Sequence, residues 1–269
     1  MKVACAQIRS FCGHVEKNVD HHLWVARQAA EVGVQVLVFP ELSLTGYALP
    51  VARECEKMAN DPIFQCLDDF GRMNNMLIIA GMPIKSIIEG HKPYIGALIL
   101  GQSNYVEMGT FYAKMHIHGK EQEYFAPGTE YCVIPINADT KLGLSVCADL
   151  TEPSHAMNTH KAGACLYAVS ALLRQSAFDK ESSLLQIYAR EHSMLVLLCN
   201  FARNYQGSGL LSVGKSSIWA PGGKLLVQAP EDTDNELLVV AEQQQIRQHD
   251  NDTCNLEWRG HLLPLISSR

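Results

Sequence analysis

The chain has 269 residues, enough for one large domain or two small ones, and 47% of them are hydrophobic. Its 22 Lys and Arg residues against 28 Asp and Glu residues give a formal net charge of -6, which argues against a nucleic-acid-binding surface. No apolar stretch approaches the length needed to span a bilayer, so no membrane partner is expected. We expect a single domain over residues 1–269.

The N-terminal residues and the cysteines indicate the cytoplasm. Residues 1–8 enter directly into a strand-like run that turns polar at Arg9, so the apolar core of a signal peptide is missing. The nine cysteines are odd in number and lie in apolar surroundings, as at Cys66, Cys165 and Cys199. Because they lack the spacing of a disulfide framework or of a metal site, a reducing compartment is expected and no cysteine metal site is predicted.

The first third of the chain alternates between strand-like and helix-like segments. Buried strands are predicted at residues 3–8, 34–39 and 77–80. Between them, apolar side chains recur at helical spacing in two groups: Val19, Leu23, Ala26 and Ala30, with a stop at Gly33, and then Ile63, Cys66, Leu67 and Phe70. This alternation is typical of an α/β protein.

The rest of the chain adds pairs of adjacent strands. Strands are predicted at residues 97–100, 109–112, 144–146, 194–199, 216–219 and 225–227. Polar or turn-rich sequence separates the first two of these and the last two, which is a hairpin pattern. Asp179 can cap a helix with apolar positions at Leu184, Leu185, Tyr188 and Ala189. We therefore expect a mixed α/β layer structure with antiparallel pairs.

Three chemically useful side chains follow directly after strand-like runs. Glu41 follows the second predicted strand, Lys114 follows the strand at 109–112, and Cys147 follows the strand at 144–146. Because rigid strands can position the residues at their ends, one sheet edge could present all three side chains together. The sequence therefore predicts an active site at this edge.

Cys147 is a candidate nucleophile, because a turn after a strand exposes it where backbone N–H groups can bind an oxyanion. An ordinary thiol has a pKa of about 8.5 and is mostly protonated at neutral pH, so it needs a base or a cation. Half-buried Glu41 could gain the raised pKa of a base. Lys114 could pair with Glu41 or stabilise a negative oxygen. None of the 11 histidines stands out as the base.

Three motifs, in this order, resemble those of the carbon–nitrogen hydrolase, or nitrilase, superfamily. Residues 40–47 read PELSLTGY, similar to the family pattern PELxxxGY. Residues 112–128 read YAKMHIHGKEQEYFAPG, similar to YxKxHL followed by an acidic residue and FxPG. Residues 147–149 read CAD and match the pattern C-x-D. The resemblance extends over residues 1–242, which is most of the chain.

The resemblance implies a Glu-Lys-Cys triad made of Glu41, Lys114 and Cys147. In such a triad Cys147 attacks the substrate carbon, and Glu41 takes the thiol proton and later activates water. Lys114 stabilises the oxyanion together with the backbone N–H of Ala148. Hydrolysis then passes through a thioester and releases ammonia or an amine.

Further site residues are suggested around the triad. Many family members carry a second, assisting glutamate, and the spacing fits Glu121 better than Glu123, which stays an alternative. Tyr47 ends the first motif and Ser170 follows a strand-like run, so both could line the substrate pocket with Ala148. Arg174 could pair with a substrate carboxylate, although a solvent-exposed arginine is the more common case.

The resemblance also implies a four-layer αββα sandwich, the absence of a metal or organic cofactor, and pairing into a homodimer or a larger homo-oligomer. The implied substrate is a small linear amide or a carbamoyl amine. We expect residues 243–269, which are mostly polar but contain Trp258 and the apolar run 262–266, to form a C-terminal extension in an oligomer interface.

The segment after the cysteine departs from the family. Many family amidases have C-Y-D-x-R-F-P-E, whereas residues 147–154 read CADLTEPS. These positions border the pocket, so the departure concerns the substrate and not the chemistry. The C-W-E pattern associated with nitrile hydrolysis is also absent, which favours an amide substrate and leaves nitrile hydrolysis in the same site as the alternative.

Two other functions are open on sequence alone. A metal-dependent amidohydrolase could use His116 and His118 with a carboxylate, but no third ligand group is evident. A nitrilase-like domain could also act as a non-catalytic binding module. Loss of triad residues would be expected in such a module, and none is lost.

Overall fold

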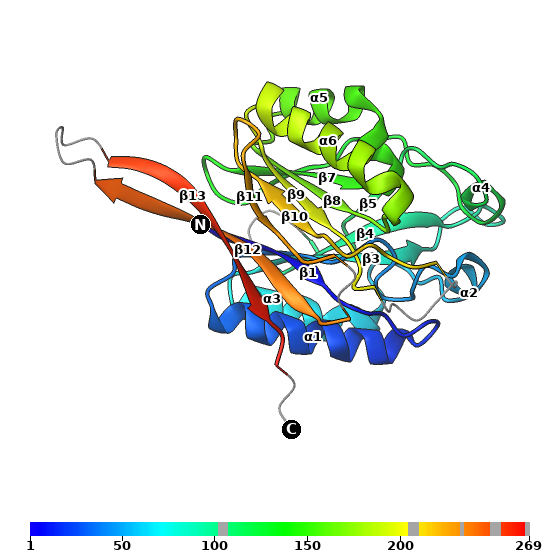
Figure 1. Ribbon diagram of the computed structural model, residues 1–269. Coiled ribbons are helices and arrows are strands. Elements are labelled where there is room, and N and C mark those ends of the chain that lie inside the picture. The colour runs from blue at the N-terminus through cyan, green and yellow to red at the C-terminus, as the bar shows by residue number, and fades with distance from the viewer. Residues whose placement is uncertain (102–106, 204–209, 232–233, 248–253, 267–269) are drawn as a thin grey trace.

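Two β-sheets lie face to face at the centre of the molecule, and helices cover their outer faces (Figure 1). The computed structural model describes residues 1–101, 107–203, 210–231, 234–247 and 254–266. The expected four-layer αββα sandwich is confirmed by this arrangement.

Both sheets mix parallel and antiparallel strands. The first sheet has seven strands, in the order β13 (Cys254–Pro264), β12 (Leu237–Arg247), β1 (Lys2–Gln7), β2 (Val36–Val38), β3 (Leu77–Ile84), β4 (Tyr94–Gly101) and β5 (Phe111–Ala113). The second has six, in the order β11 (Leu225–Gln228), β10 (Ser217–Trp219), β9 (Leu195–Cys199), β8 (Leu166–Ser170), β7 (Lys141–Val146) and β6 (Val133–Pro135). Parallel strands β1, β2 and β3 lie at the centre of the first sheet, and β7, β8 and β9 at the centre of the second.

The helices differ in length and place. The α-helices are α1 (Val15–Glu31), α2 (Leu49–Glu54), α3 (Gln65–Met73), α4 (Glu121–Tyr124), α5 (Pro153–Lys161) and α6 (Gln175–Glu191), and two 3₁₀ helices are η1 (Pro62–Phe64) and η2 (Cys147–Thr151). Helices α1 and α3 cover the first sheet, and α5 and α6 cover the second (Figure 1). None of the helices in the described ranges is long and apolar enough to cross a membrane.

The central strands are apolar on both sides because each side faces a different part of the core. In β1, Val3 and Cys5 face the cluster between the two sheets, whereas Ala4 and Ala6 face α1 and α3. Strand β9 alternates in the same way between the other sheet and α6. Successive side chains of a strand point to opposite faces, so burial of both faces produces the continuous apolar runs seen in the sequence.

The predicted helix start at Asp179 is wrong. Helix α6 begins at Gln175, Arg174 occupies its N-cap position, and Asp179 lies in the second turn. Asp is a favoured cap residue, but Phe178 is buried in the cluster beneath the helix, and that burial stabilises an additional turn before Asp179. The predicted hairpins are confirmed, because β4 pairs antiparallel with β5 and β10 with β11.

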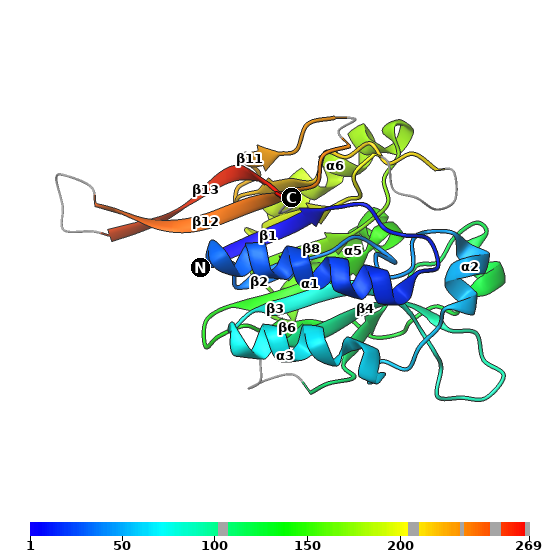
Figure 2. The same ribbon diagram turned by 90° about the horizontal axis from the view of Figure 1, so that it is seen from below.

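A long C-terminal hairpin extends the first sheet and projects beyond the body of the sandwich (Figure 2). Its strands, β12 and β13, pair from Leu237 opposite Pro264 to Arg247 opposite Cys254. Near the C-terminus, Leu263 and Leu265 pack against the cluster beneath α1. Part of the expected C-terminal extension therefore contacts the protein's own core, and its place in an oligomer interface stays a prediction.

Candidate active site

Strand direction brings Glu41 and Lys114 to one edge of the first sheet. Strand β3 runs parallel to β2, β4 runs antiparallel to β3, and β5 runs antiparallel to β4. The carboxyl ends of β2 and β5 therefore lie at the same edge. Glu41 lies in the turn after β2, and Lys114 directly follows β5.

Two glycines let the segments that carry these residues approach the sheet. A Cβ on Gly81 of β3 would lie 2.5 Å from the carbonyl oxygen of Pro40, next to Glu41. A Cβ on Gly128 would lie 2.2 Å from the carbonyl oxygen of Ala113, and the Gly128 N–H donates to the Lys114 carbonyl oxygen at 2.7 Å. Any larger residue at either position would displace the backbone beside the site. These contacts account for the glycine in the FAPG segment.

Lys114 joins two buried carboxylates. Its Nζ lies 2.7 Å from Oε1 of Glu41 and 2.7 Å from Oε1 of Glu121. All three side chains are almost fully enclosed, with relative exposures of 0% for Lys114, 1% for Glu41 and 2% for Glu121. Glu123 is exposed, so the structure brings Glu121 and not Glu123 to the lysine.

Cys147 lies where β7, a strand of the second sheet, gives way to the 3₁₀ helix η2. The expectation that one sheet edge presents all three side chains is therefore wrong, because Glu41 and Lys114 follow strands of the first sheet. Its φ angle is +45°, in the left-handed region that residues other than glycine rarely adopt. Such strained positions persist only where the surrounding structure holds them, and they gather at functional sites. The thiol is half-buried and lines a cavity together with Tyr47, Glu121 and Ala148.

Asp149 holds the turn of Cys147 against the segment that follows Lys114. Its Oδ2 accepts the Val146 N–H at 2.9 Å, and its Oδ1 accepts the N–H groups of Met115 and His116 at 3.1 and 2.9 Å. Tyr112 donates its hydroxyl to Oδ2 at 2.6 Å. The aspartate of the C-x-D motif thus fixes the cysteine turn relative to the lysine.

Burial raises the pKa of Glu41 to about 7, although Lys114 opposes this shift and the negative charge of Glu121 adds to it. Its Oε2 is buried and accepts no hydrogen bond of normal geometry from any residue that the structure describes, while the Cys147 thiol lies near enough to lower the pKa of Glu41. A carboxylate with a pKa near neutrality and a free oxygen is suited to accept a proton.

The other two groups keep their protons at neutral pH. Burial opposes the charge of Lys114, but Glu41, Cys147 and Glu121 outweigh it and raise the lysine pKa. For Cys147, burial and then the charge of Glu41 raise the thiol pKa well above its ordinary value, and Lys114 only partly opposes them. The thiol therefore needs a base at the moment of attack.

The cavity at Cys147 has a volume of about 360 Å³, which is at the small end of ligand pockets. Tyr47 and Ala148 line it as predicted, and the Tyr47 hydroxyl donates to Glu121. Ser170 lies elsewhere: it is buried, its hydroxyl donates to the Phe39 carbonyl oxygen at 2.7 Å, and it does not line the cavity. Its hydroxyl links β8 to the end of β2, because a buried hydroxyl needs a partner.

Sequence reasoning missed much of the cavity wall. The wall also contains Leu49, Leu172, Leu173, Ala177, Glu181 and Leu210. Arg174, which the sequence suggested as a partner for a substrate carboxylate, lines it before the first turn of α6. Arg174, Ala177 and Glu181 lie three and four residues apart and so share one face of that helix. The misplaced helix start at Asp179 concealed this face.

The two histidines considered as metal ligands, His116 and His118, have different contacts in the structure and do not form a metal site with the described residues. His116 lies 2.9 Å, through Nδ1, from Oδ1 of Asp149, and His118 lies exposed at the rim of the cavity. Within the described ranges, no group of three His, Cys, Asp or Glu side chains is arranged to hold a metal ion. The structure therefore provides no third ligand for the His116 and His118 pair among these residues.

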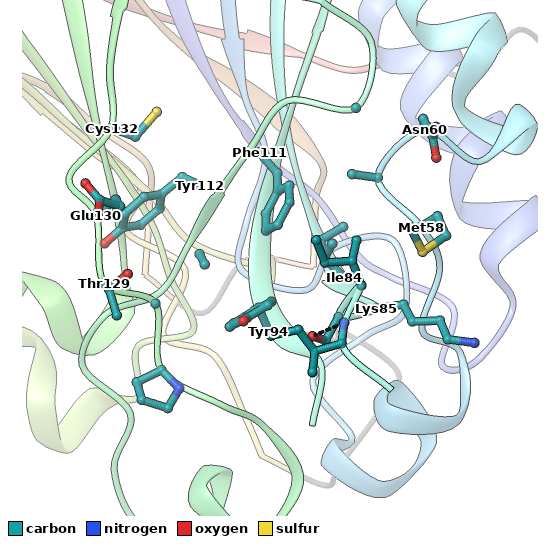
Figure 3. A pocket seen from close by; sticks show the side chains of 18 of the residues that line it. Met58, Asn60, Ile84, Lys85, Tyr94, Phe111, Tyr112, Thr129, Glu130 and Cys132 are labelled. Carbon is teal, nitrogen blue, oxygen red and sulfur yellow. Dashed lines mark hydrogen bonds between the residues drawn. The ribbon is translucent and has the colours of Figure 1, made fainter. Parts of the chain in front are cut away.

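A larger cavity, of about 680 Å³, lies beside β4 and β5 and is shown in Figure 3. Its wall includes Tyr94, Phe111 and the ring of Tyr112. Among the described residues that line it, the one thiol is that of Cys132, whose pKa burial raises to about 11. Neither Glu41 nor Lys114 lines this cavity, so size alone does not mark the reactive pocket.

The chain resembles proteins of known family over most of its length. The carbon–nitrogen hydrolase family model matches residues 2–249. A nitrilase of Pyrococcus abyssi is 26% identical over 244 residues, which cover 89% of this chain and 88% of that protein. A hydrolase of Mycobacterium tuberculosis is 27% identical over 236 residues, which cover 86% of this chain and 82% of that protein.

Solved structures share the fold. An amidase of the nitrilase superfamily from Nesterenkonia AN1 superposes with a TM-score of 0.78 at 23% identity, covering 89% of this chain and 90% of that one. A member of branch 10 of the superfamily from Saccharomyces cerevisiae has a TM-score of 0.75 at 22% identity, covering 86% of each chain. The family match over residues 2–249 shows that the chain belongs to the carbon–nitrogen hydrolase family, and these structures share its fold.

Proposed function

We propose that this carbon–nitrogen hydrolase is an amidase that cleaves a small linear amide or a carbamoyl amine, with Cys147 as the nucleophile. The observation that carries the proposal is the buried group of Glu41, Lys114 and Glu121 beside the Cys147 thiol. Enclosing three charges is unfavourable unless they are paired, so such a group is typical of a functional site.

In the first half of the reaction, Glu41 accepts the thiol proton as Cys147 sulfur attacks the carbonyl carbon. The oxyanion that forms can accept hydrogen bonds from the backbone N–H of Ala148 and from Lys114. The lysine ammonium has three N–H donors, of which Glu41 and Glu121 engage two. Each such donor contributes about 3–4 kcal/mol to transition-state stabilisation in comparable sites.

The intermediate then collapses to a thioester. The C–N bond breaks, and protonated Glu41 returns its proton to the departing nitrogen, so that ammonia or an amine leaves. In the second half, Glu41 takes a proton from water, hydroxide adds to the thioester carbon, and the C–S bond breaks. The thiol regains its proton and the acid product leaves. Two lower barriers replace the single high barrier of amide hydrolysis.

Glu121 and Tyr47 support this assignment because they hold Lys114 in place. Glu121 holds the lysine and receives the Tyr47 hydroxyl, so neither the ammonium nor the carboxylate is free to rotate away. Rigid supporting groups keep a reacting constellation at its productive geometry. We infer that Glu121 positions Lys114 and assists the proton transfers.

The size of the cavity and the related structures support a small amide. The volume of about 360 Å³ suits a compact substrate. Mutants of the Nesterenkonia amidase have been described in complex with acrylamide and with butyramide, and another mutant with the acetamide moiety of fluoroacetamide attached to the active-site cysteine. We extend that substrate class, by analogy, to this chain.

Nitrile hydrolysis is the second candidate, because the Pyrococcus abyssi relative is named a nitrilase. A thiolate can add to a nitrile carbon in the same position, and water then completes the hydrolysis. The chain has Ala148 and Asp149 where the nitrile pattern has tryptophan and glutamate. We therefore rank amides above nitriles.

The deciding experiment measures ammonia release from a panel of amides, carbamoyl amines and nitriles, with wild type and Cys147→Ala. We expect release from at least one small amide, and loss of at least 10³-fold in Cys147→Ala, because residues of a nucleophilic unit typically contribute about that much. Inactivation by alkylation of Cys147, together with full activity in the presence of a chelator, would separate this mechanism from metal-dependent hydrolysis. Release that persists in Cys147→Ala would disprove the mechanism.

We also propose that the chain forms a homodimer or a larger homo-oligomer, with residues 243–269 in the interface. The projecting β12–β13 hairpin and exposed Leu256 support this proposal. Light scattering coupled to size-exclusion chromatography tests it on the full chain and on a variant with Leu256→Glu. A wild type that is monomeric at micromolar concentration would contradict it.

A further inference from the structure

The cavity at Cys147 contains an acidic side chain for which the proposed hydrolysis has no use. Glu181 lies on the cavity-facing side of α6, in line with Arg174 and Ala177. It is close enough to the nucleophile that its negative charge raises the Cys147 pKa, and Lys114 in turn acts on the pKa of Glu181. Glu181 therefore belongs to the reaction cavity and not to the outer surface of the helix.

One oxygen of Glu181 has no partner. Its Oε2 is buried, and no described residue donates a hydrogen bond to it. Burial without a partner disfavours the charged form and raises the carboxyl pKa, although Lys180 and Arg174 oppose that shift. An enclosed acceptor without a donor destabilises the empty protein, and a bound ligand with a donor at that point would remove the penalty.

Among the described residues, none of the cavity wall donates a hydrogen bond to Oε2 of Glu181, and much of that wall is apolar enough to hold an aliphatic spacer. Leu49, Leu172, Leu173 and Leu210 form much of its wall. The positively charged residues that line it, Arg174 and Lys120, are both exposed to water at the rim. Water and salt screen exposed charges far more than enclosed ones, so these two cations neutralise the Glu181 carboxylate only in part.

We propose that Glu181 is a specificity-determining residue that binds a cationic amine on the substrate, at the end away from the scissile amide. The substrate class is then a short ω-amino amide or its carbamoyl counterpart: a protonated amine, a few methylene groups against the leucine wall, and the reacting carbon at Cys147. An ammonium group supplies both the missing donor and the opposite charge. This proposal rests on the hydrolase function proposed above and names its substrate.

The test uses pairs of amides that differ only in one terminal group. Glycinamide, 4-aminobutanamide and 5-aminopentanamide are compared with propanamide, pentanamide and hexanamide, which replace the ammonium by a methyl group, and succinamic acid carries a carboxylate instead. The measured quantity is the ratio of kcat/KM for each amino amide to that for its methyl counterpart. We expect a ratio of about 10 or more for the best-fitting spacer, and the lowest kcat/KM for succinamic acid.

The decisive variant is Glu181→Gln, which keeps the shape of the side chain and removes its charge. Because Glu181 also acts on the Cys147 thiol, absolute rates will change for every substrate, and only the ratio reports recognition. We expect the ratio to fall at least about tenfold in Glu181→Gln. Asp179→Asn is the matched control, because it removes the same charge from an exposed position on the same helix, and its ratio should equal that of wild type.

A binding measurement keeps this inference independent of the hydrolysis. Calorimetry with 4-aminobutanamide and pentanamide compares Cys147→Ala with the double variant that also carries Glu181→Gln. Preferential binding of the amino amide that disappears in the double variant supports the inference. Equal binding of the two amides, or an amino preference that survives Glu181→Gln, overturns it. Absence of ammonia from every amide would instead overturn the proposed function, while the binding comparison still decides the role of Glu181.

Discussion

Two buried polar groups flank the end of β5, and they differ in how completely their hydrogen bonds are satisfied. On one side, Glu41 pairs with Lys114 through one oxygen and leaves the other without a partner among the described residues. On the other side, both oxygens of Asp149 accept hydrogen bonds, and the network continues from Tyr112 to His155, whose ring nitrogen lies 2.9 Å from the Tyr112 hydroxyl oxygen.

The difference separates a reactive group from a positioning group. A carboxylate whose two oxygens both accept hydrogen bonds is held in one place, whereas Glu41 keeps one enclosed oxygen available and has a pKa that burial raises. Asp149 and Glu41 are both almost fully buried, so burial alone does not distinguish them. The two carboxylates differ in the number of hydrogen-bond donors that reach their oxygens, and the following predictions test that difference.

The largest effect is expected from Glu41→Gln. The amide cannot accept the thiol proton, so kcat/KM for the best amide should fall by on the order of 10³-fold. Ammonia release measures this, with far-UV circular dichroism as the check that the variant folds. Activity within tenfold of wild type would show that another group acts as the base.

The next largest loss of activity is expected from one of two nearby glutamates, and the other serves as its control. Glu121→Gln should lower kcat/KM by on the order of 10²-fold, because Lys114 loses one of its two carboxylate partners and its orientation. Glu123→Gln removes an equal charge from an exposed position two residues away and should leave kcat/KM within about twofold of wild type. Equal losses in both variants would contradict the assignment of Glu121.

Because the pKa of Glu41 is about 7, kcat/KM should rise with pH by about tenfold per unit below pH 7 and level off above it. The base must be deprotonated to act, so activity rises with pH.

The contribution of Glu41 to stability changes with pH in the opposite direction. The folded-state pKa lies above the ordinary value of 4.5, so the contribution of Glu41 to the free energy of unfolding is fully present below pH 4.5 and lost as pH rises through 7. Urea unfolding at pH 5 and pH 8, compared with Glu41→Gln, measures it; a pH-independent difference would contradict the raised pKa.

The smallest effect on activity is expected from a substitution at Asp149, whose two oxygens both accept hydrogen bonds. Asp149→Asn replaces an acceptor by an NH₂ group that must face an existing donor, and each N–H left without an acceptor costs about 1–3 kcal/mol. We expect a clear drop in Tm and a loss in kcat of about tenfold or less, while the pH profile keeps its shape. Asp139→Asn, in an exposed turn, is the control and should leave Tm unchanged. A shifted pH limb in Asp149→Asn would mean that Asp149 takes part in proton transfer.

The three triad residues could be predicted from the sequence because each one follows a strand that is itself predicted from the sequence. Glu41, Lys114 and Cys147 each follow an apolar run, and strand direction brings the ends of β2 and β5 to one edge of the first sheet. Cys147 follows β7 of the second sheet, so the packing of the two sheets brings its thiol to the other two groups. Short motifs therefore identified the reacting groups, whereas the packing of one sheet against the other, which the strand patterns did not predict, assembles them.

The cavity wall could not be predicted in the same way. Glu181 and Leu210 reach the site from segments with no motif of their own, and their side-chain directions depend on how α6 lies on the second sheet. Ser170 illustrates the reverse case. It ends a central strand next to the site, as the sequence suggested, but its hydroxyl is used to link the two sheets.

The C-terminal hairpin is a second feature that the local sequence pattern could not predict. Residues 243–245 are three consecutive glutamines with no apolar alternation, so local pattern favours no strand there. They are strand residues in the structure because β13 pairs with β12 along its whole length. Pairing with the other strand of a hairpin can override weak local preference.

The complete burial of Lys114 also has a practical consequence for observing the molecule. Its ammonium is charged, enclosed and held by Glu41 and Glu121, so amine-directed acylating reagents, which need an accessible neutral amine, cannot label it while the site is closed. Exposed lysines such as Lys120 and Lys180 offer an internal reference for the reagent. The rate at which Lys114 becomes acylated, followed by mass spectrometry, would therefore report how often the site opens. This measurement needs no substrate.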